Sequence, residues 1–386
     1  SRAMSNPKKN SSEVKEPLIR IAKREKMSGG KTLLFYTLAI VIALIIGGFF
    51  ILLIGKNPFI YYGKVIAGNF TNLIYLKHFI EKIVPLIITS LGISVAFRMK
   101  FWNIGAEGQF IMGALMSSTI IFALGNTPGW ITVILALVFG VLGGGVYALI
   151  VGLLKVQLNS NETLLTLMLN YIALYLLGFL KKTNYYKQLG VGAFIDFKAL
   201  PRNGWLATLG SGVFTIDISV FFAIGLVAFI FFYINYTKQG YEINVIGDSI
   251  NTAKYAGMNV KGIILRTVFM SGAIIGLAGA LQVMGTASNH MLSTGITSGV
   301  GWTGIIIAWL SRLNPVGILI TSILMGMLEN GSSVAESAMG ISTASADVIQ
   351  GLILFTVLAM DFFLRYKVII RKKEKKENSV TEEVVK

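Results

Sequence analysis

The chain has 386 residues, of which 54% are hydrophobic and only 13% are charged, and its mean hydropathy is +0.71. Soluble domains carry about 25% charged residues, so this composition excludes an ordinary soluble protein and predicts an integral membrane protein. Apolar runs of about twenty residues recur along the chain, which predicts an all-α bundle of membrane-spanning helices. There is no cysteine, which excludes disulfides and thiolate metal sites.

The formal net charge of +16 comes largely from the two ends of the chain. Lysine and arginine crowd residues 1–31 and 369–386, which are predicted to be basic cytoplasmic tails that touch anionic membrane lipid. No nucleic-acid partner is expected. The opening "SRAM", residues 1–4, looks like a remnant of an expression tag. Residues 32–368 then form one transmembrane domain.

Ten apolar segments fit the pattern of a membrane-spanning helix. They lie at residues 33–54, 79–97, 101–124, 131–154, 163–180, 217–236, 263–286, 299–311, 315–330 and 347–368. An even number of spans puts both termini on one side, and the positive-inside rule makes that side the cytoplasm. Segment 299–311 is too short to cross ~30 Å of hydrocarbon, so some helices are predicted to be broken or re-entrant.

The stretch "GGKT" at residues 29–32 resembles the end of a phosphate-binding loop. The first glycine of that motif would fall on Glu25, and no strand precedes it, so no nucleotide site is predicted. His78 and His290 are too few for a metal site. The sequence therefore predicts no cofactor and no metal, and a membrane enzyme would lack a nucleophile or an acid–base pair.

The stretch "FWNIGAEGQFIMGA", residues 101–114, places Asn103, Glu107 and Gln109 in an apolar run. Charged groups inside a membrane are costly, so these side chains are predicted to face the interior of the bundle. Asn103 and Glu107 are four residues apart and are expected on one helical face, with Gln109 offset. Two interpretations stay open: a substrate pathway, or a Glu107 that hydrogen-bonds backbone or caps a broken helix.

Other polar or aromatic residues are weaker candidates for a substrate pathway. The glycine-rich "SGVGWTGIIIA" shares a G-x-x-G step with "NIGAEGQFIMGA", which is weak evidence for an internal repeat. For Glu329 a solvated helix end is the alternative, while Trp302 and Trp309 are aromatic side chains with flat faces that a planar ligand could stack on. The further candidates are Asn170, Gln282, Trp302, Glu329 and Asn330.

The loop at residues 237–262, "TKQGYEINVIGDSINTAKYAGMNVKG", predicts a short helix. Asp248 or Ser249 can cap it and Gly257 can end it. About two turns of helix are not stable alone, so this helix needs a partner surface unless it is an ordinary connector at the membrane interface.

Four motifs in this order carry a resemblance: "FWNIGAEGQFIMGA", "NETLLTLMLNYIA", "GDSINTAKYAGMNV" and "GWTGIIIAWLSRLNPVGI". Over about residues 58–360 the chain resembles the permease subunit of bacterial ATP-binding-cassette importers of the ribose-type, simple-sugar and nucleoside class. Ribose permeases tend to carry an aspartate where this chain has "NIGAEGQ", so it is more similar to the nucleoside branch. The resemblance implies a type II-like ABC importer permease fold in a bacterial plasma membrane, moving a nucleoside or simple sugar inward.

The resemblance also implies partners. A cytoplasmic ABC ATPase would bind and hydrolyse the ATP, so the chain itself is no enzyme. Asn103, Glu107 and Gln109 would lie near the translocation path, beside a second permease subunit that commonly differs from the first. An extracellular substrate-binding lipoprotein would dock on the loop at residues 181–217.

The resemblance further implies that residues 247–257 form the coupling helix that sits in a groove of the ATPase. Ala253, Tyr255 and Ala256 would pass closure of the ATPase to the seventh span. The residues assigned to this element are Gly247, Asp248, Ser249, Ala253, Tyr255, Ala256 and Gly257.

Two other classes of transporter stay open on the sequence. A passive solute channel is favoured by the glycine-rich helices and the paired short segments. A proton-coupled secondary transporter would use Glu107 and Glu329. Only the importer requires the short cytoplasmic helix to bind an ATPase.

Overall fold

The computed structural model describes residues 19–23, 29–189 and 194–370, and most of them are helical. Most of the two predicted tails, including residues 1–4, lies outside this part of the chain. The α-helices described are α1 (Gly29–Leu53), α2 (Pro58–Ala67), α3 (Leu73–Arg98), α4 (Ala106–Ala123), α5 (Gly129–Leu158), α6 (Glu162–Leu180), α7 (Ser219–Tyr236), α8 (Lys238–Asp248), α9 (Ile250–Tyr255), α10 (Val260–Met284), α11 (Val300–Leu310), α12 (Pro315–Met339) and α13 (Ala344–Arg365).

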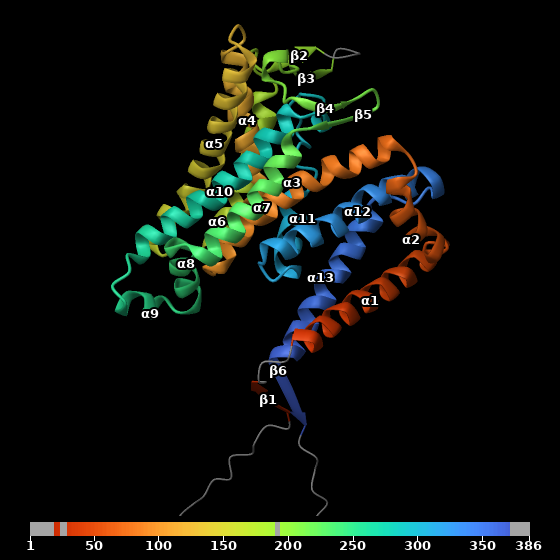
Figure 1. The fold of residues 1–386 in the computed structure, drawn as a ribbon, viewed down its shortest axis with the longest axis vertical. Coiled ribbons are helices and arrows are strands. Elements are labelled where there is room, and N and C mark those ends of the chain that lie inside the picture. The colour runs from red at the N-terminus through yellow and green to blue at the C-terminus, as the bar shows by residue number, and fades with distance from the viewer. Residues whose placement is uncertain (1–18, 24–28, 190–193, 371–386) are drawn as a thin grey trace, which may run out of the picture.

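The described strands form three antiparallel ribbons of two strands each. They are β1 (Ile19–Lys23) with β6 (Tyr366–Ile370), β2 (Lys187–Leu189) with β3 (Ile195–Phe197), and β4 (Thr208–Ser211) with β5 (Phe214–Asp217). Figure 1 shows β2–β5 at one end of the helical bundle, with α8, α9, β1 and β6 toward the other. The bundle therefore has two structurally different ends.

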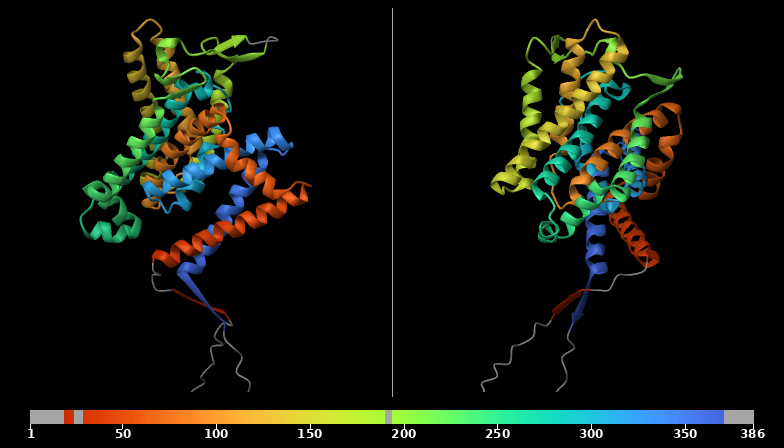
Figure 2. Two further views of the ribbon diagram at one scale, coloured as in Figure 1. Left: turned by 45° about the vertical axis from the view of Figure 1, so that its right-hand side comes forward. Right: turned by 60° about the vertical axis from the view of Figure 1, so that its left-hand side comes forward.

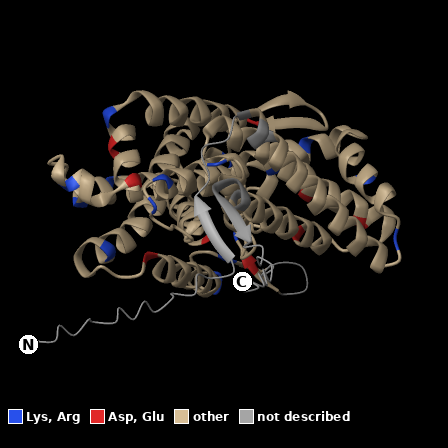
Figure 3. Ribbon diagram, turned by 90° about the horizontal axis from the view of Figure 1, so that it is seen from below, with Lys and Arg blue, Asp and Glu red and all other residues tan. Residues whose placement is uncertain are grey.

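Every predicted span contains a helix, which confirms the all-helical membrane fold. Within the described ranges, eight helices are long and apolar enough to cross a membrane: α1, α3, α4, α5, α6, α7, α10 and α12. Helices α11 and α13 are shorter apolar helices, as the length of segment 299–311 led us to expect for α11. Lys, Arg, Asp and Glu are sparse along the ribbons in Figure 3.

Some helix boundaries differ from the prediction. Helix α4 begins at Ala106 and not at residue 101, because residues 101–105 are not helical. Helix α12 extends to Met339, beyond the predicted end at residue 330. The sequence analysis missed α2, whose ten residues are too few for a span; Asn57 caps it by accepting bonds from the amides of Phe59 and Ile60.

Helices α3, α4, α5 and α10 form the core of the bundle, and α6 and α7 lie outside it. The most apolar window of α3 is 83% buried, whereas that of α6 is 22% buried. Small residues allow α5 and α10 to touch: a Cβ on Gly276 would overlap the backbone of Gly140 and Gly144. Close backbone approach through glycine is a common packing mode in membranes.

Helices α1 and α13 pack on each other beside this core (Figures 1 and 2). Helices α11 and α12 lie between that pair and α3, with contacts to both. Polar residues from α3, α11, α12 and α13 are therefore brought to one region of the bundle.

Candidate translocation site and coupling helix

The segment between α3 and α4 is irregular and largely buried, so its backbone needs partners. Helix α6 supplies two of them. The amide of Asn170 donates to the carbonyl of Ile104 at 2.8 Å, and the hydroxyl of Thr166 accepts from the Ile104 N–H at 3.2 Å. The Asn170 carbonyl also accepts from the Gly108 N–H at 2.8 Å, in the first turn of α4. Asn170 therefore supports a broken helix.

Asn103 and Gln109 form a reciprocal amide pair. Each donates to the other, at 3.0 Å and 2.8 Å, and the Asn103 amide also donates to the Ser271 hydroxyl of α10 at 3.1 Å. Both side chains are almost fully buried. The expectation that Asn103 shares a helical face with Glu107 is wrong, because Asn103 precedes the start of α4. The pair fastens the loop to α4 and α10, and its role in a pathway stays a prediction.

Glu107 caps a second broken helix. Its carboxylate accepts from the Gly301 N–H at 2.7 Å, and the Thr297 side chain and Trp302 backbone also hydrogen-bond to it. Gly299, the N-cap residue of α11, has no side chain that could do this. A carboxylate at a helix N-terminus is favoured by the unpaired N–H groups and the helix dipole. The cap interpretation is thus the one the geometry supports, and the two G-x-x-G stretches meet in space.

Two polar cavities of about 460 Å³ and 320 Å³ lie beside this junction. Both volumes fall in the range of about 300–1,000 Å³ typical of small-molecule sites. Both cavities are lined by residues of α3, α11, α12 and the segment before α11. Residues of α13 add to the wall of the larger cavity, and a residue of α10 adds to the wall of the smaller. The two share four wall residues, which are Lys82, Ser298, Glu329 and Ser333.

Glu329 is the centre of the polar contacts in these walls. Its Oε1 accepts from the Thr303 hydroxyl at 2.8 Å and from the Gln350 amide at 3.3 Å. Its Oε2 lies 3.7 Å from the Lys82 ammonium. The alternative of a solvated helix end is wrong for Glu329, because α12 continues to Met339 and only 12% of the side chain is exposed.

Trp302 also lines the larger cavity, and its role in a pathway stays a prediction. Trp309 does not line either cavity. Trp309 stacks on Trp102 with ring centroids 5.4 Å apart, so one of its faces is already covered. Gln282 and Asn330 line the smaller cavity. Asn103, Glu107, Gln109 and Asn170 lie outside both walls.

The sequence analysis missed Lys82, Thr303, Asp347 and Gln350, which also line the larger cavity. A signal was present for Lys82, since it is a lysine inside a predicted span, and such residues are expensive unless they serve a purpose. Gln350 had the weaker signal of a buried amide in the last span.

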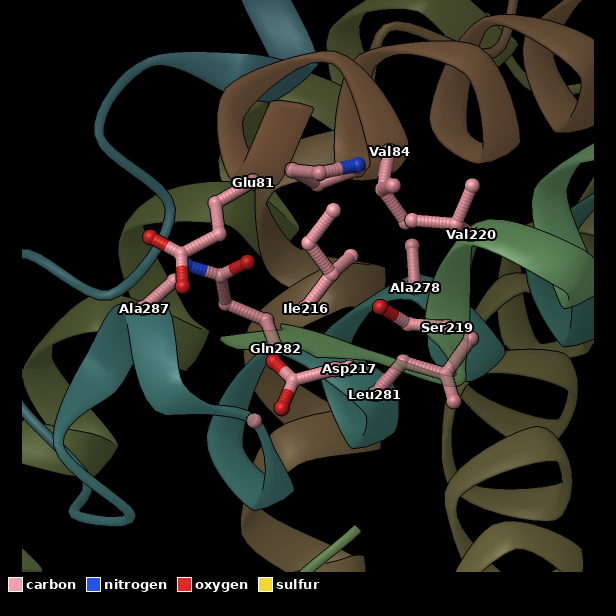
Figure 4. A pocket seen from close by; sticks show the side chains of 12 residues that line it. Glu81, Val84, Ile216, Asp217, Ser219, Val220, Ala278, Leu281, Gln282 and Ala287 are labelled. Carbon is pink, nitrogen blue, oxygen red and sulfur yellow. The ribbon is translucent and has the colours of Figure 1, made fainter. Parts of the chain in front are cut away.

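Two acidic residues, Asp217 of the β4–β5 ribbon and Glu81 of α3, lie close together beside a pocket (Figure 4). Asp217 accepts from the Thr286 N–H at 2.8 Å, and the Thr286 hydroxyl lies 2.5 Å from Glu81 and 3.1 Å from Asp217. Among the residues that the structure describes, the Asp217 Oδ1 has no hydrogen-bond partner. Burial raises the pKa of the Asp217 carboxyl above its ordinary value, although the bonds from Thr286 oppose that shift.

The short helix predicted near residue 250 is present as α9. Ser249 caps it, accepting from the Thr252 N–H at 3.2 Å, while Asp248 ends α8; Gly257 follows α9 with a positive φ of 71°. Tyr255 is 93% exposed, whereas Ala253 is completely buried. Of the three residues expected to contact a partner, Ala253 therefore faces the chain itself, and Tyr255 and Ala256 face outward.

Gly247, near the end of α8, is where the α8–α9 segment contacts the helical bundle. It is buried, and a Cβ there would overlap the backbone carbonyl of Arg98 at the end of α3. Helix α8 is held a second time by the Arg266–Glu242 pair at 2.9 Å, which joins it to α10. Helix α8, which directly precedes α9, therefore contacts both α3 and α10.

Comparison with known proteins identifies the family. Residues 75–358 match the family described as "Branched-chain amino acid transport system / permease component". A guanosine ABC transporter permease protein of Bacillus subtilis is 28% identical, over 86% of this chain and 95% of the relative. A nucleoside ABC transporter permease protein of Lactococcus lactis is 27% identical, over 76% and 82%.

A third relative is a glucose ABC transporter permease protein of Haloferax volcanii, which is 26% identical over 86% of this chain and 88% of the relative. The family match covers most of the chain and all the helices around the two cavities from α3 to α13. The chain belongs to this permease family and is the membrane-spanning permease subunit of an ABC importer.

Proposed function

We propose that this permease imports a nucleoside, with a simple sugar as the second choice, using ATP hydrolysed by a separate cytoplasmic ATPase. The observation that carries the proposal is the pair of polar cavities that share Lys82 and Glu329 in their walls. The names of three relatives, which refer to guanosine, nucleosides and glucose, support the choice of substrate. Hydroxyl and amide groups of such substrates match the donors and acceptors of these walls.

In this proposal the substrate passes along the cavities, and Glu107, which lies outside both walls, affects them through α11 and does not hold the substrate. Glu107 fixes the N-terminus of α11, and Trp302 in the first turn of that helix forms part of the wall. Asn103, Gln109 and Asn170 hold the opposite broken helix in place. Buried side chains thus anchor the N-terminal ends of α4 and α11 beside the proposed pathway.

Helix α9 is the part that we assign to the ATPase. It offers an exposed aromatic and small surface, with Tyr255 and Ala256, on a segment that is tied to α3 and α10. Tyrosine is enriched in protein–protein interfaces, so the exposed Tyr255 suits a docking surface. Closure of the ATPase on ATP would then move the helices that carry Lys82 and Gln282.

The orientation follows from this assignment. Since α9 lies toward the same end as β1 and β6 in Figure 1, both termini would be cytoplasmic, in the bacterial plasma membrane. The ribbons β2–β5 would then be extracellular and available to a substrate-binding lipoprotein. A second permease subunit, of the same or a different sequence, would complete the pathway.

Uptake in the native bacterium tests the proposal. Cells lacking this chain should lose accumulation of labelled guanosine, and the plasmid-borne chain should restore it. Because ATP drives the transport, accumulation should survive an uncoupler that collapses the proton gradient. Unchanged guanosine uptake without the chain, or loss of leucine uptake alone, would refute a nucleoside importer. Accumulation abolished by the uncoupler at constant cellular ATP would indicate a proton-coupled carrier.

A further inference from the structure

Within the described part of the chain, the Lys82–Glu329 pair lies at the boundary of the two cavities and has unused hydrogen-bonding capacity. Its charged atoms are 3.7 Å apart, which is longer than a hydrogen bond between these groups. The Lys82 side chain is 39% exposed, and both residues line both cavities. The ammonium donors and the Glu329 Oε2 are therefore open to a third group.

The other carboxylate oxygen of Glu329, Oε1, accepts hydrogen bonds from residues of α11 and α13. The Thr303 Oγ1 lies 2.8 Å from the Glu329 Oε1 and 3.3 Å from the Gln350 Oε1. A hydroxyl has one proton to donate, and the shorter distance assigns it to Glu329. The Gln350 amide donates to the same Oε1. These contacts fix the direction of the carboxylate, so that Oε2 is presented to Lys82 and the cavities. A preorganised acceptor of this kind gives up little conformational entropy when it binds.

An aromatic surface accompanies the pair. Trp302 lines the larger cavity with Lys82 and Glu329, and 46% of its surface is exposed. Indole faces stack on heterocyclic bases without reading their edges. The same cavity therefore combines a donor, an acceptor and a stacking wall.

We propose that Lys82 and Glu329 bind the vicinal hydroxyls of a ribose while its base lies against Trp302. This assignment rests on the proposed function and names the part of the substrate that the permease recognises. A hydroxyl accepts one hydrogen bond and donates another, so it can bridge an ammonium and a carboxylate that do not bond each other directly. The permease thus selects the sugar and tolerates changes in the base.

A zwitterionic amino acid is the competing ligand for such a pair, with its carboxylate on Lys82 and its ammonium on Glu329. We favour the diol because Glu329 and Lys82 already neutralise each other, and a neutral hydroxyl can enter without separating them. Trp302 also provides a wall for a planar base, which a branched aliphatic side chain does not need.

Saturation-transfer NMR on the purified full-length chain tests this assignment without the binding protein. Guanosine, 2′,3′-dideoxyguanosine and leucine are titrated at millimolar concentration against the parent chain, Glu329→Gln and Glu336→Gln. Glu336 is an exposed carboxylate on the same helix, outside both cavities, and serves as the matched control. The parent and Glu336→Gln should bind guanosine about tenfold more tightly than the dideoxy analogue.

Glu329→Gln should lower guanosine binding to the level of 2′,3′-dideoxyguanosine and leave binding of the analogue unchanged, which also shows that the variant is folded. If its unfolding temperature falls, Lys82→Met carries the same comparison with less risk to folding. Equal binding of guanosine and the analogue by the parent overturns the assignment, as does displacement of guanosine by leucine. Absence of guanosine binding overturns it too, while the cellular uptake test decides the proposed function separately.

Discussion

The buried amides around Asn103 and the charged pair of Lys82 and Glu329 are both polar clusters inside the helical bundle, yet they differ in how completely they are paired. Asn103 and Gln109 satisfy each other and Ser271 within the bundle. Lys82 and Glu329 meet at 3.7 Å beside open space. A fully buried polar group that lacks a hydrogen-bond partner costs free energy, so such groups are paired within the protein. A polar group that faces a cavity remains able to bind a ligand. We infer that the first cluster serves the fold and the second serves transport.

Asn103→Leu should have the largest effect on the fold. It leaves both ends of the Gln109 amide without their partner and removes a donor from Ser271, and each buried group left unpaired costs about 1–3 kcal/mol. We expect little monodisperse protein after detergent extraction and a markedly lower unfolding temperature. Lys82→Met is the matched control and should extract normally. Equal stability of the two variants would remove the distinction between the clusters.

Glu107→Ala should have an intermediate effect, because it removes the cap of α11 and leaves the amide cluster intact. Loss of a cap costs about 1 kcal/mol, and a misplaced α11 would move Trp302 in the cavity wall. Guanosine uptake is expected to fall about tenfold while the protein still assembles. Glu107→Gln keeps an acceptor for the Gly301 N–H and should retain more uptake. Normal uptake by Glu107→Ala would mean that the cap is dispensable.

Asp217 should make stability depend on pH. Its folded-state pKa is raised by burial, so the folded state holds the proton more tightly than the unfolded state does. The contribution of Asp217 to stability is therefore largest at low pH and is lost as the pH rises from about 4 through the raised pKa. Unfolding temperatures measured across that range should decline for the parent chain and change less for Asp217→Asn, which keeps an acceptor for the Thr286 N–H. An identical pH profile in both would exclude this residue as the cause.

Tyr255→Glu should affect the fold least, since surface changes usually alter stability by less than about 0.5 kcal/mol and this side chain is 93% exposed. Its expected effect is on assembly, because a charge would enter the surface that we assign to the ATPase. Co-purification from the native membrane measures this. Tyr241→Glu, on the exposed side of α8, is the comparison variant. Retention of the ATPase by Tyr255→Glu would argue against α9 as the docking element.

The sequence could predict the elements that local rules determine. Hydropathy located the ten apolar segments, and the Ser249 cap and Gly257 located α9, because these signals lie within a few residues. The resemblance of four motifs also led to the family. The polarity of Glu329 and the aromatic Trp302 were enough to mark two residues that do line the larger cavity.

The contacts that join distant segments could not be predicted in this way. Glu107 reaches Gly301 across 194 positions in the sequence, and no local pattern specifies that meeting. Asn103 was assigned to a helix because the apolar run continues through it, although the glycines that follow allow an irregular segment. Whether Lys82 and Gln350 face lipid or a cavity depends on the rotation of α3 and α13, which only the packed bundle determines.

Guanosine uptake by Glu329→Gln, normalised to the amount of assembled importer in the membrane, shows whether the Lys82–Glu329 pair contacts the substrate. We expect normal assembly and at least about a tenfold loss of uptake relative to the parent, with Glu336→Gln unaffected. Uptake by Glu329→Gln equal to that of Glu336→Gln would show that the incompletely paired cluster is not where this permease meets its substrate.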